Sequence, residues 1–253
     1  MKNLFSNLIL CSVLTLALFA QTSFLSAEDN VIPVVTPGTP SFEEKVGTAP
    51  SDAIVLFDGT NKEAFVSARK NKEGEPVDWE LKDGILTCVP GAGDILTKEK
   101  FADCQLHIEW KVPPSNRKGQ DRGNSGIKFA GLYEVQILDS LNNNTYKDGI
   151  AGAIYQQYPP MVMPTYPAGQ WNTYDIIYTA PRFDEEGKLL SPAKITLFFN
   201  GVLVQLEKEI KGPTSRRGQA YKAHSPEQRI LIQDHNNPIQ FRNIWIRKLS
   251  LAE

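Results

Sequence analysis

The feature that most constrains the fold of this chain is a series of short strand-like segments separated by turn residues. Asp83-Gly84 and Asn200-Gly201 each join two such segments, and both pairs are typical of β-hairpin turns because they tolerate positive φ angles. After the N-terminal region, no segment keeps a helical period over more than about two turns, which argues against βαβ units. The pattern therefore predicts an all-β sandwich. Its strand-like segments are residues 54–57, 79–81, 85–88, 104–112, 125–130, 133–138, 173–179, 194–199, 202–206, 229–233 and 241–249.

Length and charge narrow the class of protein. All-β sandwiches reach lengths like the 253 residues of this chain as a single domain. Lysine and arginine number 27 against 29 aspartate and glutamate residues, so there is no excess positive charge to hold a polyanion. We therefore expect one folded domain and no nucleic-acid partner.

The N-terminus, residues 1–27, has the pattern of a secretory signal peptide. Lys2 gives a positive start, residues 8–19 are apolar, and Ala27 ends a stretch with small residues. Polar residues from Gln21 leave the apolar run shorter than a bilayer span needs, so we expect no stable membrane insertion after cleavage. The predicted location is secreted or periplasmic. Residues 28–50 are proline-rich and are expected to form a linker, and residues 51–253 are expected to form the sandwich.

Two cysteines, Cys88 and Cys104, follow the predicted signal peptide. An exported chain can form a disulfide bond, and both cysteines lie in predicted strands or at their ends. Pairing also requires a geometry that the sequence does not show, so the sequence leaves their pairing open.

The strand of residues 133–139, with the sequence YEVQILD, carries the most informative polar pattern. Side chains alternate between the faces of a strand, so Glu134 and Gln136 share one face. Asp139 falls on the opposite face unless a β-bulge intervenes. The spacing has the form of the Glu-x-Asp-x-x-Glu strand of laminarinase-like glucanases. The simpler alternative is a solvated outer face with Asp139 at the start of a turn.

A second polar group, Gln233-Asp234-His235, follows the apolar residues 230–232. Alternation places Gln233 and His235 on one face, and His235 changes its charge near neutral pH, as a general acid or base does. The alternative is a loop histidine that only satisfies a neighbouring carbonyl group. No other histidine has a metal-ligand spacing with His235, so we expect no histidine-based zinc site.

The loop of residues 121–126 places Arg122 and Asn124 next to glycines that let a ligand approach the backbone. Such a loop suits sugar hydroxyls or a developing negative charge on oxygen, although a turn chosen for its backbone conformation explains it equally well. Ser125 lacks the Gly-x-Ser-x-Gly context of a hydrolase nucleophile. Tyr155 lies in an aromatic and polar stretch of the kind that holds sugars.

Eight short motifs follow one another along the chain: Leu56-Phe57-Asp58-Gly59-Thr60, Gly123-Asn124-Ser125-Gly126-Ile127, Tyr133-Glu134-Val135-Gln136-Ile137-Leu138-Asp139, Gly152-Ala153-Ile154-Tyr155, Trp171-Asn172, Asn200-Gly201, Gln233-Asp234-His235 and Phe241-Arg242-Asn243-Ile244. In this order they resemble the successive motifs of the 3-keto-disaccharide hydrolase domain, and the resemblance covers nearly everything from Ser51 to the C-terminus. The resemblance implies a concanavalin A-like jelly roll of two antiparallel sheets with a concave face for carbohydrate. It also implies action on glycosides oxidised at C3. An insertion at residues 181–191 and Pro238, where the family more often has a glycine-containing turn, depart from the pattern.

The implied substrate suggests a chemistry that needs one base and one stabiliser of negative charge. A ketone at C3 acidifies the C2 proton, whose removal gives an enolate that expels the C1 substituent, and water then adds to the enone. We hypothesise that Glu134 or His235 is the base. The other candidate site residues are Arg122 and Gln233, expected near the enolate oxygen, and Asn124, Gln136, Asp139 and Tyr155, expected as substrate contacts.

The same fold is also compatible with other functions. The main alternative is a non-catalytic carbohydrate-binding module, because a fold does not determine a function, and an interaction domain is a third. A retaining glycosidase would need Glu134 and Asp139 on one face, roughly 5 Å apart. We expect a small saccharide as the partner, no cofactor and no metal in the site. The architecture can hold a structural calcium ion, although no Asp-rich loop of the expected kind is present.

Overall fold

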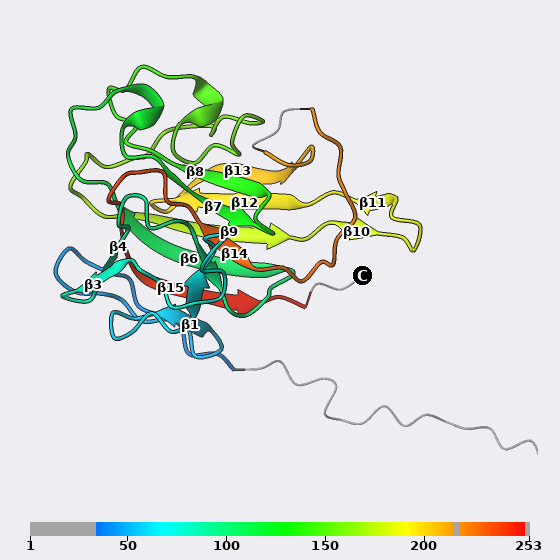
Figure 1. Ribbon diagram of the computed structural model, residues 1–253, viewed down its shortest axis with the longest axis horizontal. Coiled ribbons are helices and arrows are strands. Elements are labelled where there is room, and N and C mark those ends of the chain that lie inside the picture. The colour runs from blue at the N-terminus through cyan, green and yellow to red at the C-terminus, as the bar shows by residue number, and fades with distance from the viewer. Residues whose placement is uncertain (1–33, 215–217, 251–253) are drawn as a thin grey trace, which may run out of the picture. The chain divides into compact units, whose positions relative to one another are not determined.

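The computed structural model describes residues 34–214 and 218–250 (Figure 1). The predicted signal peptide and the first residues of the predicted linker lie outside these described residues. Within the described part of the chain, no helix is long and apolar enough to cross a bilayer. The helical elements of the described residues are two short 3-10 turns, η2 (Gly119–Asp121) and η3 (Lys147–Gly149).

The larger of two main sheets has eight strands in the order β13-β12-β9-β6-β15-β4-β3, with β1 also paired to β15 (Figure 1). The long strand β15 is central because one of its edges pairs with β6 and the other pairs with both β4 and β1. Its strands are β1 (Ile54–Phe57), β3 (Glu80–Lys82), β4 (Ile85–Thr87), β6 (Cys104–Lys111), β9 (Asn172–Thr179), β12 (Lys194–Phe199), β13 (Val202–Glu209) and β15 (Gln240–Lys248).

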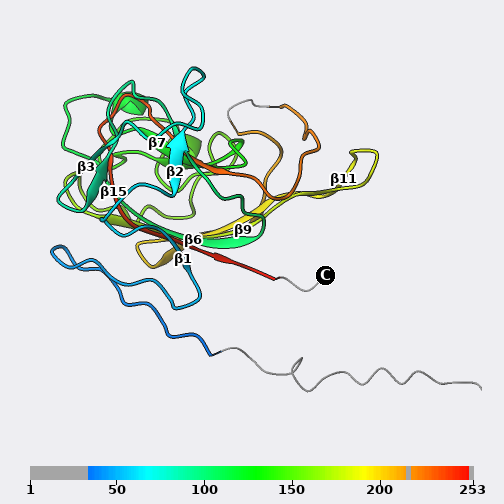
Figure 2. The same ribbon diagram turned by 60° about the horizontal axis from the view of Figure 1, so that its bottom comes forward.

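The smaller sheet has five strands in the order β2-β5-β14-β7-β8, and it lies across the interior from β6 and β9 (Figure 2). All pairings in both sheets are antiparallel, so the prediction of an all-β sandwich of two antiparallel sheets is confirmed. The insertion at residues 181–191 forms a separate hairpin of β10 (Arg182–Phe183) and β11 (Leu189–Ser191). The strands of the smaller sheet are β2 (Phe65–Ser67), β5 (Ile95–Thr97), β7 (Ser125–Phe129), β8 (Tyr133–Ile137) and β14 (Ile230–Ile232).

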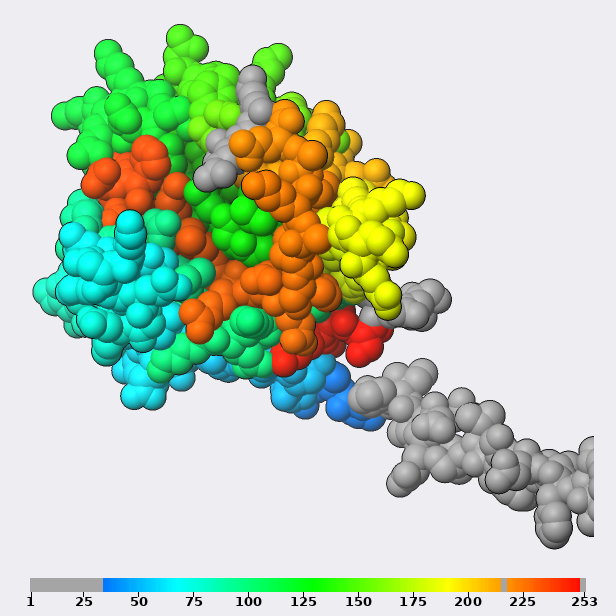
Figure 3. All heavy atoms as spheres, turned by 45° about the vertical axis from the view of Figure 1, so that its right-hand side comes forward, coloured from blue at the N-terminus to red at the C-terminus, as the bar shows by residue number. Residues whose placement is uncertain are grey.

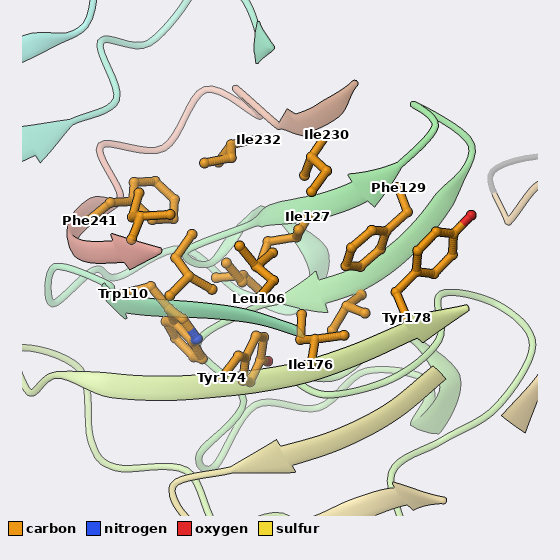
Figure 4. Close-up of a cluster of buried hydrophobic side chains, with 14 of the residues drawn as sticks. Leu106, Trp110, Ile127, Phe129, Tyr174, Ile176, Tyr178, Ile230, Ile232 and Phe241 are labelled. Atoms are coloured by element: carbon orange, nitrogen blue, oxygen red, sulfur yellow. The ribbon is translucent and has the colours of Figure 1, made fainter. Parts of the chain in front are cut away.

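The hydrophobic core fills the space between the two sheets (Figure 4). Phe129 from the smaller sheet stacks on Tyr178 from the larger one, with ring centroids 4.2 Å apart and planes inclined by 13°. Trp110 of β6 meets the edge of Tyr174 of β9 at 5.2 Å. Because strand side chains alternate, committing Phe129 and its alternate neighbours to the core turns the residues between them to the outside of the sheet.

Cys88 and Cys104 are buried members of this core, and both are free thiols. Burial raises the pKa of each thiol, so both stay neutral at physiological pH. They therefore pack as small apolar residues, and neither has the exposed, low-pKa environment of a reactive cysteine.

Part of the predicted linker contacts the outer face of the larger sheet. Residues from Val35 onward belong to the same compact unit as the sandwich. Arg242 of β15 holds this segment by donating hydrogen bonds to the carbonyl oxygens of Phe42 and Glu43, each at 2.9 Å. Figure 2 shows this blue segment on the side of the larger sheet that faces away from β7. The proline-rich stretch is thus anchored to the sheet at Phe42 and Glu43.

Arg242 also forms a buried ion pair with Glu109 of β6, with Nε and Oε2 2.7 Å apart. Burial alone would raise the pKa of Glu109, but hydrogen bonds from His107, Ser41, Asn243 and Arg242 lower it to about 2. Glu109 is therefore charged at neutral pH, and its charge is balanced within the structure.

We predict that Arg242→Ala lowers the free energy of unfolding by about 3–5 kcal/mol, because it removes the guanidinium that pairs with the buried Glu109 carboxylate. Arg247→Ala is the matched control, since Arg247 pairs with the exposed Asp52 and its loss should change stability far less. Urea unfolding of both variants measures this difference. Equal losses in the two variants would contradict the structural role of the Arg242–Glu109 pair.

Candidate functional site

The outer face of the smaller sheet carries one row of side chains that crosses all five strands. The register pairs Glu134 of β8 with Lys128 of β7, and pairs Lys128 in turn with Leu231 of β14. Leu231 pairs with Leu96 of β5, which pairs with Val66 of the edge strand β2. Directly paired residues of an antiparallel sheet point to the same face. The row is therefore ionic at its β8 end and apolar at its β2 end.

A second row beside the first is polar. Gln136 of β8 pairs with Gly126 of β7, and the carbonyl oxygen of Gly126 accepts the backbone N–H of Gln233 at 2.9 Å. Asp94 precedes β5 and accepts the backbone N–H of Asp234 at 2.8 Å. In the space-filling view, the bright green of β7 and β8 forms the floor of a hollow bordered by orange and cyan segments (Figure 3). Polar groups of β7 and β8 thus lie next to polar groups of the residues that flank β14 and β5.

Glu134 is the most buried acid of this face, with 3% of its surface exposed. Burial raises the pKa of its carboxyl group, the nearby Asp94 raises it further, and the charge of Lys128 opposes both effects. The Lys128 ammonium lies 3.4 Å from Glu134 Oε2, and the Gln136 amide, oriented to satisfy its neighbours, donates to Oε1 at 3.2 Å. A carboxylate of raised pKa beside a cation can accept a proton from a ligand.

Gly126 is required for this arrangement because the Glu134 side chain lies across it. A Cβ atom at residue 126 would fall far inside van der Waals contact with Glu134 Oε1. Gly126 has no unusual backbone angle that would itself demand glycine. The motif Gly-Asn-Ser-Gly therefore supplies the space into which the Glu134 carboxylate folds.

Asp94 and His235 lie at the β5 and β14 side of the hollow. Burial raises the pKa of Asp94, whereas the N–H of Asp234 and the charges of Lys128 and His235 lower it. His235 is exposed, and it follows Asp234, whose backbone N–H donates to Asp94 at 2.8 Å. Gln233 Oε1 is buried and has no hydrogen-bond partner among the described residues. An unpaired polar atom of this kind can be satisfied by a ligand that donates a hydrogen bond.

Asp139 and Arg122 form a pair of their own beyond the end of β8. Arg122 Nε lies 3.1 Å from Asp139 Oδ2, and the same guanidinium donates to the backbone carbonyls of Asp139 and Leu141. Strand β8 pairs with β7 without a register shift, so the bulge that would bring Asp139 beside Glu134 is absent from it. The two-carboxylate arrangement of a retaining glycosidase therefore does not form here.

Two further predicted contacts have partners within the protein. Asn124 Nδ2 donates to the carbonyl oxygen of Gln120 at 2.7 Å, and Asn124 is buried. The Tyr155 hydroxyl lies 2.7 Å from the hydroxyl of Tyr146, which is exposed. These residues shape the loops near the β8 edge. No group of three or more His, Cys, Asp or Glu side chains suited to a metal ion occurs in the described ranges 34–214 and 218–250.

The sequence of this chain matches one protein family over most of its length. The model of the 3-keto-alpha-glucoside-1,2-lyase-like domain matches residues 52–247, which include both rows of the outer face. The chain belongs to this family. A curated relative, the 3-keto-disaccharide hydrolase of Bacteroides thetaiotaomicron, is 24% identical over 151 residues, covering 49% of this chain. The chain spans only 51% of that protein.

Solved structures agree with the family. A candidate glycosyl hydrolase from Parabacteroides distasonis is 43% identical, with a TM-score of 0.79, and the match covers 88% of this chain and 97% of that one. A second candidate glycosyl hydrolase from the same species is 19% identical and has a TM-score of 0.57, with 79% of this chain and 94% of that one covered. The second shows the shared fold. Together the relatives support a carbohydrate-active, glycoside hydrolase-like function.

Sequence reasoning missed two members of the site, Lys128 and Asp94. A signal for Lys128 was present, because a tight turn after Phe129 places residue 128 opposite Glu134. Asp94 had no local signal, since it comes from a segment distant in sequence and reaches the site only through the pairing of β5 with β14.

We predict that Gly126→Ala destabilises the protein by about 1–3 kcal/mol, because the new methyl group overpacks the space of the Glu134 side chain. The same substitution made in a Glu134→Ala background should cost far less, since the space is then empty. A double-mutant cycle of urea unfolding measures the coupling between the two residues. Additive effects would show that Glu134 does not lie over Gly126.

Proposed function

We propose that this protein cleaves 3-keto-glycosides in the hollow on the outer face of the smaller sheet. The observation that carries the proposal is the buried Glu134 carboxyl group, with its raised pKa and Lys128 at 3.4 Å. One base and one adjacent cation are what an enolate mechanism requires. The family match over residues 52–247 supports a 3-keto sugar as the substrate.

In the proposed reaction, Glu134 removes the C2 proton of the sugar. The electrons of the C2–H bond form an enolate whose negative charge develops on the C3 oxygen. The Lys128 ammonium stabilises this charge. Arg122, for which we expected this task, is held by Asp139 and by backbone carbonyls, so Lys128 is better placed.

Collapse of the enolate then breaks the bond between C1 and the aglycone oxygen, and the aglycone leaves as an alcohol after taking a proton. Water adds at C1 of the resulting enone, and a proton returns to C2. The net reaction is hydrolysis, and no redox partner is consumed. Gln136 orients Glu134, and Gln233 Oε1 can accept a hydrogen bond from a sugar hydroxyl.

We predict that the wild-type protein releases sugar from a 3-keto-α-glucoside and leaves the unoxidised parent glucoside intact. Glu134→Gln should lower kcat by about 10²–10⁴-fold, the usual contribution of a general base. His235→Ala should retain most of the activity, because His235 is exposed at the border of the hollow. A loss confined to His235→Ala would instead make His235 the base. Binding without release of sugar would favour the carbohydrate-binding module.

The pH profile gives a separate prediction. A base must be deprotonated, so kcat/KM should fall as pH decreases through the pKa of Glu134. Lys128 lowers that pKa, so Lys128→Met should move the acidic limb of the profile to higher pH and should also lower kcat.

Lys82→Met is the matched control, since Lys82 is an exposed lysine on β3 of the larger sheet and should change neither quantity. An acidic limb that stays in place in Lys128→Met would show that Glu134 does not set it.

A further inference from the structure

The row that contains Glu134 and Lys128 continues into apolar side chains that the proposed chemistry does not use. Leu231 pairs with Lys128, and Leu96 pairs with Leu231. Both leucines are half-buried and belong to neither the core cluster between the sheets nor the residues packed against it. They therefore form an accessible apolar strip directly beside the ionic end of the row.

The apolar strip leads to a cavity at the edge strand. Val66 is the next member of the row after Leu96, and it lines a cavity of ≈ 460 Å³. The rest of the lining combines apolar side chains, including Pro76, Val77 and Leu81, with polar and charged ones. The volume falls in the usual range for small-molecule sites. The row thus passes from Lys128 through Leu231 and Leu96 to the buried Val66, which borders the cavity.

We propose, on the basis of the function proposed above, that the site takes 3-keto-glycosides whose aglycone is apolar, with the sugar over Glu134 and Lys128 and the aglycone on Leu231 and Leu96. An aglycone longer than these two side chains extends toward the cavity beside Val66. The register fixes this direction, because the ionic residues of the row lie on β8 and β7 and its leucines lie on the next two strands, β14 and β5.

Physical chemistry favours this occupant over a second sugar. Covering the leucine side chains with an apolar group removes apolar surface from water on both partners. A sugar on the leucine side chains would lose the water bound to its hydroxyl groups, and the leucines offer no hydrogen bonds to replace that water. The tyrosines that could stack on a sugar, Tyr155 and Tyr146, contact each other at the β8 side of the sheet instead.

The test compares two substrates of matched shape, cyclohexyl and inosityl 3-keto-α-glucosides, which differ in the hydroxyl groups of the aglycone ring. We expect kcat/KM of the wild-type protein to be at least about tenfold higher for the cyclohexyl substrate. The hydroxyl groups make inositol the better leaving group, so a bias from leaving-group chemistry alone would run the other way.

Two variants locate the preference. Leu231→Asn and Leu96→Asn should each lower the cyclohexyl-to-inosityl ratio of kcat/KM by about tenfold. Leu206→Asn is the control, because Leu206 is a leucine of the larger sheet with 56% of its surface exposed, and its change should leave the ratio as it is.

The outcomes separate the two proposals. Cleavage of both substrates with equal kcat/KM, or a preference that survives in both Leu231→Asn and Leu96→Asn, overturns the aglycone assignment and leaves 3-keto-glycoside cleavage standing. Cleavage of neither substrate by the wild-type protein overturns the proposed function and this assignment with it. The wild-type comparison does not depend on the folding of any variant.

Discussion

The antiparallel pairing of β7 with β8 is the constraint on which the site depends. The core takes Phe129 and Val135 from these strands, and Phe129 is fixed by its stack on Tyr178 of the larger sheet. A slip of one residue would send Glu134 into that apolar core and bring core residues to the surface. The cost of such a slip is large, so the same packing that stabilises the sandwich also holds Glu134 opposite Lys128.

Two buried glutamates on opposite faces of the sandwich have pKa values shifted in opposite directions, because their surroundings differ. Glu109 receives hydrogen bonds from Arg242 and Asn243, each at 2.7 Å, and its pKa is lowered to about 2. Glu134 has one ammonium group at 3.4 Å, and burial raises its pKa. A fully paired carboxylate has little capacity left for a proton, whereas an incompletely paired one can exchange a proton with a ligand. The first glutamate anchors the N-terminal segment, and the second is the candidate base.

Local patterns were sufficient to predict the sandwich and part of the site. Hairpin turns such as Asn200-Gly201 and period-two alternation located most strands, and the same alternation placed Glu134 and Gln136 on one face, which β8 confirms. The pairing of Arg122 with Asp139 could not be read in this way, because it depends on the path of a loop after β8 ends. Asp94 joins the site only through the order of strands in the sheet, and strand order is a long-range property.

The most direct test of the central claim, that the sugar is cleaved through loss of its C2 proton, is mass spectrometry of the product formed in D₂O. Elimination and rehydration replace the C2 proton with one from solvent. The account therefore predicts one deuterium at C2 in the sugar released at early times, above a control of free 3-keto-sugar incubated without protein. Released sugar that carries no deuterium at C2 would show direct hydrolysis at C1 and would contradict the account.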